Sequence, residues 1–527
     1  MQGSNLTQYL QKKVSEYKTL FGFDMNFKKH KIKITIACAL IASFIFFANV
    51  IVSSFSCSRE QEFQFIQIQQ AQQDELIEQT GKAKIALLFT GSTRGNFEPC
   101  GCGGVYQGGL SRRATIIDKI RVLNRNTILL DTGDISVGGS RVQFEFLAQA
   151  YQRLKYDAIA LGEGDIRLGI EDFVQLAQKY NLPFISSNLQ IQANNKAEQL
   201  AINNVLPKFR IIKRAGRKIA IISVLAQRWL AILPMTIRKR IEYKKPAIAI
   251  KQITTVLKRQ CDFIILLSHL GPGDREILKY QLDGIDLWID NGGHQWTRKS
   301  VQSSEITKNI FLDSNPPLLI SWKNDRRIGI AAIDLNKYLH VKQAGLVPIE
   351  KNILRESAFL EIYDAYKYAA RQEMLSRIYS QYEQASTTQP VKFKYVSSET
   401  CAKCHKSIFD FWKRTAHAHA FATLVKEHRD DDPNCWACHT TGFRSPNGFS
   451  DPKITPELKN VGCQSCHKID IRTHLKNAEK MSKRQKKISL ITRSWHCRRC
   501  HVPHRSPNYD YKSYLKAISC KKAKTHK

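Results

Sequence analysis

Cys401-Ala402-Lys403-Cys404-His405 has the pattern C-x-x-C-H, which decides the fold of the C-terminal region. The pattern recurs at Cys435–His439, Cys463–His467 and Cys497–His501. In such a motif two thiols add to the two vinyl groups of one haem, and the adjacent histidine ligates the iron. Zinc also binds paired C-x-x-C motifs, but it does not need a histidine directly after each pair. Four motifs with that histidine therefore predict four haem c groups.

Each motif assigns two attachment cysteines and one proximal histidine. The cysteines are Cys401, Cys404, Cys435, Cys438, Cys463, Cys466, Cys497 and Cys500, and the histidines are His405, His439, His467 and His501. Residues 391–527 are too few to enclose four haems in an ordinary core, so the haems themselves must form that core. This predicts a mainly helical, haem-packed cytochrome domain over residues 391–527, with electron transfer as its function.

The residues around these motifs resemble the cytochrome c-554 family of tetrahaem electron carriers. The matching segments include Tyr395-Val396, Trp412-Lys413, His417-Ala418, Cys438-His439-Thr440-Thr441-Gly442-Phe443, Val461-Gly462-Cys463-Gln464-Ser465-Cys466-His467 and His504-Arg505-Ser506-Pro507. The resemblance implies His417, His474 and His504 as sixth ligands of three irons, with His419, His428 and His496 in reserve. One iron is five-coordinate in that family. The resemblance thus leaves a second function open, an enzyme acting on a small nitrogen compound at an open haem.

Residues 84–345 alternate between apolar runs and amphipathic stretches, which predicts a layered α/β domain. The expected buried strands are Ile85–Thr90, Thr127–Leu130, Ala158–Leu161, Ile219–Val224, Phe263–Leu267 and Asp286–Ile289. The expected helices are Ser111–Leu123, Phe144–Leu154 and Ile248–Lys258. Residues 346–390 follow as a connector, with a long helix predicted over Ile353–Ala385.

The α/β region resembles the calcineurin-like metallophosphoesterases of the 5′-nucleotidase branch, which implies an αββα fold. In that family the motifs Asp-x-His, Gly-Asp, Gly-Asn-His-Glu, a lone His and Gly-His-x-His hold two metals beside a substrate phosphate. The first motif is lost here, since Ser92 and Arg94 stand where its Asp and His belong. Gly164 replaces the catalytic histidine, and Trp296 replaces the second histidine of the last motif.

By this resemblance the ligands of the second metal survive as Asp134, Glu163, His269 and His294. Two histidines and two carboxylates suit one Mn, Fe or Zn ion. The alternative is an inert scaffold in which these residues only form hydrogen bonds. Phosphate ester hydrolysis is not expected, because the first metal and the catalytic histidine are both missing. A 5′-nucleotidase-like hydrolase tethered to a cytochrome remains a further alternative, and no catalytic residue is assigned.

Residues 34–56 are uncharged and mostly apolar, long enough to cross a bilayer as one helix. Lysines 28, 29, 31 and 33 precede this segment, so residues 1–33 are expected in the cytoplasm and the chain after it outside. The segment is either an uncleaved anchor or a signal cut before Cys57, with a lipid on that cysteine. Residues 57–83 form a polar spacer. Membrane attachment facing the periplasm or another extracytoplasmic compartment agrees with c-type haem attachment, which takes place there.

The formal net charge of the chain is +35. No nucleic-acid-binding motif accompanies it, so a basic surface for acidic redox partner proteins or anionic lipids is expected and nucleic acid is not. Cys100 and Cys102 are separated by one residue, which is short for a disulfide, and are either free thiols or part of a metal site. Cys38, Cys261 and Cys520 carry no motif and are expected to be structural.

Overall fold

The computed structural model describes residues 73–99, 107–292, 311–312, 315–321, 326–387, 395–445, 447–467, 474, 494–502, 506 and 509–520. All of them fall within one unit, Gln72–Lys527. None of the helices in these stretches has the length and hydropathy needed to cross a bilayer. The segment predicted to do so, residues 34–56, lies outside the described residues, as does Cys57.

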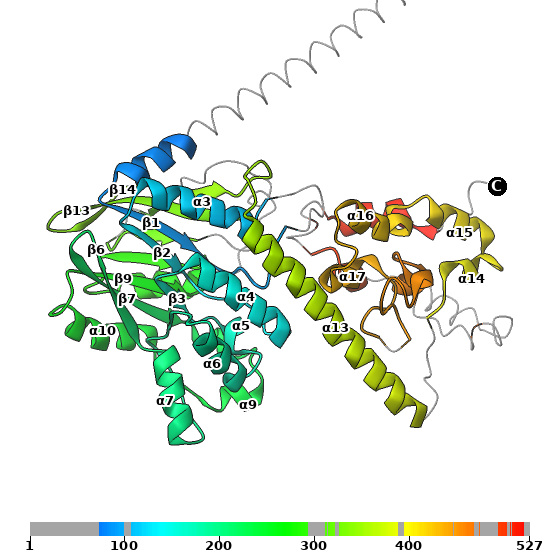
Figure 1. Ribbon diagram of the computed structural model, residues 1–527, viewed down its shortest axis with the longest axis horizontal. Helices are drawn as coiled ribbons and strands as arrows, with labels where there is room; N and C mark the ends of the chain where they lie inside the picture. The colour runs from blue at the N-terminus through cyan, green and yellow to red at the C-terminus, as the bar shows by residue number, and fades with distance from the viewer. Residues whose placement is uncertain are drawn as a thin grey trace, which may run out of the picture. The chain divides into compact units, whose positions relative to one another are not determined.

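Two six-stranded sheets form the centre of the α/β domain (Figure 1). The first, in the order β14-β13-β1-β2-β3-β4, contains β1 (Ile85–Thr90), β2 (Thr127–Asp131), β3 (Ala158–Ala160), β4 (Phe184–Ile185), β13 (Arg327–Leu335) and β14 (Leu339–Pro348). The second, in the order β11-β12-β10-β9-β7-β6, contains β6 (Phe209–Arg214), β7 (Arg217–Leu225), β9 (Phe263–His269), β10 (Leu287–Asp290), β11 (Phe311–Leu312) and β12 (Leu318–Ile320). A separate pair joins β5 (Leu189–Ile191) to β8 (Ile241–Tyr243).

The apolar strands are buried because both of their faces are covered. Every residue of β1, β2 and β9 is buried, as expected for strands inside a layered domain. Side chains from both sheets share one core, which includes Phe89, Leu130, Ile221 and Leu267. All six apolar runs predicted as strands form strands, here β1, β2, β3, β7, β9 and β10. The coarse prediction of an α/β layered domain is therefore confirmed.

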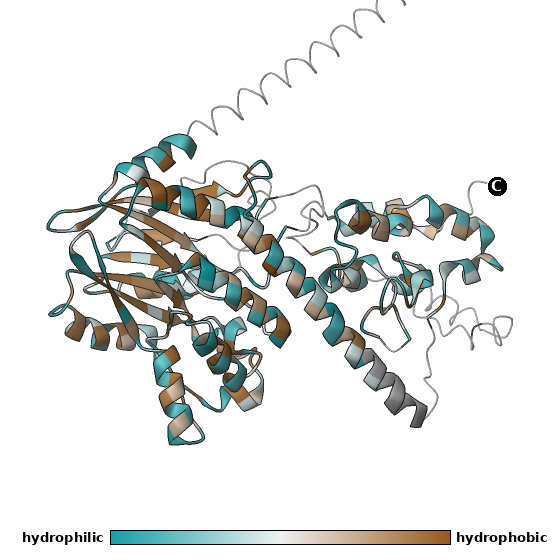
Figure 2. Ribbon diagram, viewed as in Figure 1, coloured by the Kyte–Doolittle hydropathy of each residue, from teal (hydrophilic) through white to brown (hydrophobic). Residues whose placement is uncertain are grey.

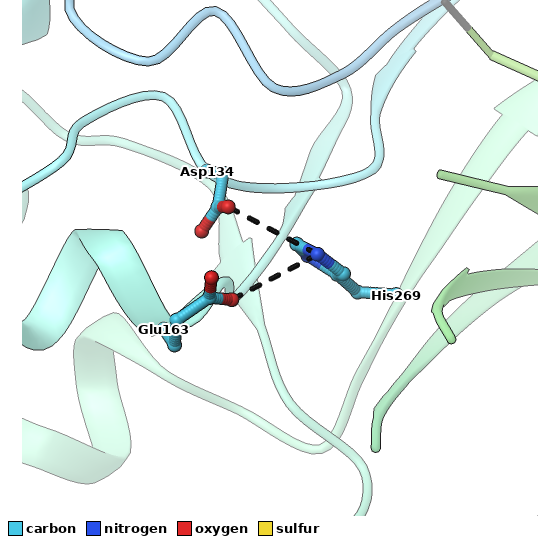
Figure 3. Close-up of side chains that lie close together, drawn as sticks. All are labelled: Asp134, Glu163 and His269. Atoms are coloured by element: carbon cyan, nitrogen blue, oxygen red, sulfur yellow. Dashed lines mark ion pairs between the residues drawn. The ribbon is translucent and has the colours of Figure 1, made fainter. Parts of the chain in front are cut away.

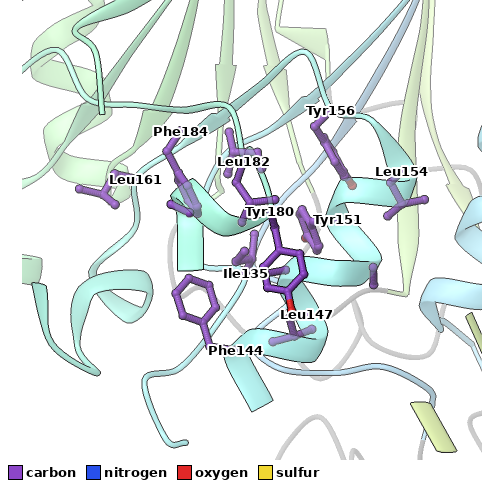
Figure 4. Packing of buried hydrophobic residues seen from close by; sticks show 14 of the residues in the cluster. Ile135, Phe144, Leu147, Tyr151, Leu154, Tyr156, Leu161, Tyr180, Leu182 and Phe184 are labelled. Atoms are coloured by element: carbon purple, nitrogen blue, oxygen red, sulfur yellow. The ribbon is translucent and has the colours of Figure 1, made fainter. Parts of the chain in front are cut away.

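Helices cover the outer faces of the two sheets, which completes four layers. Against the first sheet a large core brings together side chains of α3 (Leu110–Leu123), α4 (Arg141–Leu154), α6 (Ile170–Lys179) and α7 (Lys196–Val205). Figure 4 shows part of this core, with Phe144, Leu147 and Tyr151 of α4 among the side chains drawn. Against the second sheet lie α10 (Pro246–Leu257) and α11 (Pro272–Lys279). Shorter helices are α5 (Glu163–Ile166), α8 (Gln227–Leu230) and α9 (Met235–Arg238). Figure 2 shows hydrophobic strands between helices of mixed hydropathy.

The long helix α13 spans Ser357–Thr387, slightly later than predicted. Phe359, Tyr363 and Tyr366 on its first turns belong to the core of the α/β domain. Further along, Met374 packs against a small cluster of the C-terminal region. One helix thus contacts both parts of the described chain, which makes it more than a connector.

The C-terminal region consists of short helices, as predicted. They are α14 (Ser398–Ala402), α15 (Lys406–Lys413), α16 (Ala420–Lys426), α17 (Pro433–His439), α18 (Cys463–Cys466), α21 (Ser494–Cys497) and α22 (Tyr511–Ile518), with 3₁₀ turns η3 (Ala416–His419) and η4 (Pro456–Leu458). Trp436 is fully buried, and Phe421 and Phe449 pack around it. This cluster is far smaller than the cores of the α/β domain, which agrees with a region built around cofactors.

Candidate haem and metal sites

The C-x-x-C-H motifs form single helical turns. The amide of His405 donates to the carbonyl of Cys401 at 2.9 Å, and the same bond closes Cys463–His467 and Cys497–His501. The second motif, Cys435–His439, is the end of helix α17. Residues three apart in a helical turn share a face, so both thiols of a motif lie on one side. All eight motif cysteines are described by the structure, and none of them forms a disulfide. This donor set fits covalent haem attachment.

Two proximal histidines face predicted sixth ligands. The ring centres of His405 and His474 are 6.2 Å apart, and those of His417 and His501 are 6.1 Å apart. An iron midway between two imidazoles needs a metal–nitrogen bond of about 2.0 Å and about 1.1 Å more to each ring centre, about 6.2 Å in all. Both pairs therefore have the spacing of two histidines on opposite faces of one haem iron.

Hydrogen bonds orient other imidazoles. The Nδ1 of His439 lies 2.6 Å from the carbonyl oxygen of Ala420, and because a carbonyl only accepts, Nδ1 carries the proton. Its Nε2 is then the unprotonated nitrogen, the form that ligates a metal. His419 differs, because its Nε2 lies 2.9 Å from the carbonyl oxygen of Lys413 and must donate to it. Burial, together with nearby His501, lowers the pKa of His417, which favours its neutral form.

The cysteines show which motifs are neighbours. A hydrogen bond between the thiols of Cys401 and Cys463 raises the pKa of Cys401 and lowers that of Cys463 to about 6. A corresponding bond from Cys438 raises the pKa of Cys500. The first motif therefore adjoins the third, and the second adjoins the fourth.

A second candidate site lies at one edge of the α/β sheets (Figure 3). Asp134 follows β2, Glu163 begins α5 just after β3, and His269 is the last residue of β9. Asp134 and Glu163 follow neighbouring parallel strands of the first sheet, so they lie at one edge of it. His269 comes from the second sheet, at the end of β9, and meets them there. All three are buried. They form the one candidate metal cluster in the part of the chain that the structure describes.

The geometry of this cluster suits one metal ion. The Nε2 of His269 lies 3.9 Å from Oδ2 of Asp134 and 3.8 Å from Oε2 of Glu163. An ion about 2.0–2.2 Å from each ligand atom fits between them. Burial, reinforced by the charge of Asp134, raises the pKa of Glu163 to about 8. A cation between the carboxylates would relieve that repulsion, so the residues fit a divalent metal.

Arg94 and Ser92, which stand where the family resemblance implies ligands of a first metal, form hydrogen bonds within the site. The Nη1 of Arg94 donates to Oδ2 of Asp134 at 3.1 Å. Ser92 donates from Oγ to Oδ1 of Asn291 at 3.0 Å. Arg94, Ser92 and Asp134 all have positive φ angles, a strained conformation that is common at functional loops. The residues that replaced the ligands thus form direct contacts within the site.

Two residues of this site escaped the sequence prediction. Asn291 directly follows β10, and its Nδ2 lies 3.5 Å from Nδ1 of His269. Buried Asp165 accepts amide hydrogens of Gly162, Asp134 and Ser136 and so fixes the two loops that carry the carboxylates. The sequence signal that could have identified them is position, because Asn291 follows strand β10 and Asp165 lies shortly after strand β3. The remaining predicted site residues lie outside the described ones, namely His294, His504, Trp296, Cys100 and Cys102.

Comparisons with known proteins divide the chain in the same way. The family model "Cytochrome c554 and c-prime" matches residues 400–468. Cytochrome c-554 of Nitrosomonas europaea is 35% identical over 82 residues, which cover 13% of this chain and 35% of that protein. The 5′-nucleotidase of Vibrio cholerae is 24% identical over 249 residues, 43% of each chain. The crystal structure of a 5′-nucleotidase precursor from Thermus thermophilus matches 54% of this chain and 59% of its own at 18% identity, with a TM-score of 0.45.

The chain therefore spans less than half the length of these curated relatives. Its C-terminal region resembles the cytochrome c-554 family, and its middle region resembles the 5′-nucleotidases.

Proposed function

We propose that this protein is a membrane-attached, extracytoplasmic tetrahaem c-type cytochrome that transfers electrons. The observation that carries the proposal is the spacing of His405 with His474 and of His417 with His501, close to 6 Å in both pairs. An iron held between two histidines has no open position for a substrate, which favours electron transfer over small-molecule chemistry at these two sites.

The residues of the C-terminal region have defined tasks in this function. Haem c, when bound, supplies one-electron redox chemistry. The cysteines hold each group in place, and the bond from His439 to the carbonyl of Ala420 fixes the imidazole orientation. Cys401 lies beside Cys463 and Cys438 beside Cys500, so the motifs that carry them are neighbours. Such closeness favours rapid transfer from one haem to the next.

The proposal also covers compartment and partners. The apolar segment at residues 34–56 would attach the protein to the membrane, either directly or through a lipid on Cys57. The net charge of +35 favours association with acidic redox proteins, because opposite charges steer encounter. Both statements rest on the sequence.

For the α/β domain we propose a degenerate phosphoesterase fold that holds one divalent metal at most. The ion pair of Arg94 with Asp134 supports this, because a fixed positive charge there opposes a second cation. With Gly164 in place of the catalytic histidine, no side chain at that position protonates a leaving group.

The spin state of the irons tests the electron-transfer proposal. In the full chain, His417→Ala should convert one haem from low spin to high spin in magnetic spectroscopy, because it loses one of two axial nitrogens. His419→Ala is the matched control, since His419 already donates to a backbone carbonyl, and it should leave every haem unchanged. An unchanged spectrum for His417→Ala, or a change for His419→Ala, would overturn the ligand assignment.

A further inference from the structure

The helix that carries the second haem motif begins at a buried carboxylate. Asp432 is fully buried and caps α17, where its Oδ1 accepts the amide of Asn434 at 3.0 Å. Its backbone carbonyl accepts the amide of Cys435, also at 3.0 Å. The carboxylate therefore lies within one helical turn of a haem-attachment cysteine.

Two side chains bind the other oxygen of this carboxylate. The hydroxyl of Tyr363 donates to Oδ2 of Asp432 at 2.5 Å, and Nη2 of Arg429 donates to the same atom at 2.8 Å. Burial alone would raise the pKa of Asp432, but Arg429 and Tyr363 together hold it below its ordinary value. Asp432 is therefore an anion at neutral pH, and Arg429 is its counterion.

Arg429 and Tyr363 connect helix α17, which carries the second motif, to the α/β domain. Nη1 of Arg429 donates to the carbonyl of Pro99 at 2.6 Å, in the loop that follows β1. The ring of Tyr363 stacks on Phe97 of the same loop, with ring centres 5.8 Å apart. Tyr363 itself lies on α13 within the core of the α/β domain. The position of the carboxylate thus depends on Tyr363 directly, and through Arg429 on Pro99, both outside the cytochrome-like region.

A second set of contacts holds the same two surfaces together. Nδ2 of Asn434 donates to the hydroxyl of Tyr366 at 2.6 Å. One and two turns after Tyr363 along α13, Lys367 pairs with Asp431 at 3.0 Å and Arg371 pairs with buried Asp451 at 2.7 Å. Because these residues recur at the helical spacing, one face of α13 is committed to the C-terminal region.

We propose that Asp432 is a positioning residue that sets the reduction potential of the haem at Cys435 and Cys438, and that the α/β domain holds its charge in place. The inference rests on the proposed function, because it requires a haem at this motif. A fixed negative charge in a buried site stabilises the oxidised form of a nearby haem relative to the reduced form. The degenerate domain would then act as a scaffold for redox tuning.

An isosteric substitution separates this role from simple helix capping. Asn is as good an N-cap as Asp, so Asp432→Asn keeps the cap and removes only the charge. Arg429, with a side chain 13% exposed, then loses its counterion. We expect the reduced-to-oxidised ratio of one haem in four to rise at least tenfold at fixed potential, an upward shift of about 59 mV in its midpoint.

The adjacent Asp431→Asn is the matched control. It makes the same charge change at a half-exposed side chain, and Lys367 keeps its second ion pair, with Asp364 at 3.1 Å. It should leave all four midpoints in place, as measured by spectroelectrochemical titration of the full-length holoprotein. If Asp432→Asn does not accumulate, Tyr363→Phe decides. Arg429 still keeps Asp432 ionised, and loss of the hydroxyl dipole leaves the negative charge less offset, so the same midpoint should fall.

Four unchanged midpoints in a folded, four-haem Asp432→Asn protein would overturn the inference, as would an equal shift in Asp431→Asn. Where Tyr363→Phe must decide, its failure to lower a midpoint does the same. Failure of the proposed function is a separate outcome, since it shows as missing haem or missing redox activity already in the wild type.

Discussion

Removing the guanidinium of Arg94 should tighten metal binding at Asp134, Glu163 and His269. The Nη1 of Arg94 is 3.1 Å from the Asp134 oxygen that would ligate the ion. With a metal–oxygen bond of about 2.1 Å, that nitrogen is at most about 5.2 Å from the ion. Side-chain exposure of Arg94 is 34%, so solvent screens the repulsion, and we apply the dielectric constant of water. A divalent ion is still opposed by about 1.6 kcal/mol, slightly more than tenfold in affinity.

The assay is titration calorimetry of Mn²⁺ into the full-length protein. Arg94→Gln keeps a donor for Asp134 and removes the charge, and it should bind one Mn²⁺ at least tenfold more tightly than wild type. Arg217→Gln is the control, because Arg217 forms an exposed ion pair with Asp262 and should leave the affinity unchanged. Equal affinity of Arg94→Gln and wild type would refute the electrostatic reasoning, and absence of binding in both would refute the metal site.

Three further outcomes follow from the same residues. Metal affinity should rise with pH and level off above about pH 8, because below the raised pKa of Glu163 an incoming ion must displace a proton from that carboxyl group. A flat affinity profile in calorimetry across pH 6–9 would contradict this expectation. Nucleotide and phosphodiester hydrolysis should stay at the no-enzyme rate with Mn²⁺ added, and turnover that disappears in Asp134→Asn would contradict the degenerate-site proposal. Trp436→Ala should lower the free energy of unfolding by about 3–5 kcal/mol, because it empties the centre of the small cluster on α17, and an unchanged urea midpoint would argue against that packing.

The layered fold was predictable from sequence because its central strands are buried on both faces and appear as short apolar runs. Strand β13 was not predicted, and Gly329 in its middle shows why a local pattern fails there. A Cβ on Gly329 would lie 2.2 Å from the ring of Phe89 on β1, so glycine permits a close approach that only the folded structure reveals. Strand β6 is a largely exposed edge strand with several basic residues, and its apolar pattern is correspondingly weak.

In the candidate sites, the residue types were predictable from the sequence, whereas the contacts between distant residues were not. Motif spacing predicts the haem cysteines and proximal histidines. Family resemblance supplied Asp134, Glu163 and His269, which the structure brings together. Pairing between distant residues was beyond the sequence. That His474 faces His405, and that Tyr363 binds Asp432, depends on contacts between segments roughly 70 residues apart. Likewise, the long helix was predicted as a connector, because nothing in its pattern shows that it binds two partners.

Reductive titration of the purified full-length protein, followed by haem absorbance, tests the central claim most directly. Four C-x-x-C-H motifs with covalent haem predict that each chain reversibly takes up four electrons, with a pyridine haemochrome count of four in the same sample. Zinc in place of iron, or fewer than four electrons per chain in fully loaded protein, would contradict the account of this protein as a tetrahaem electron carrier.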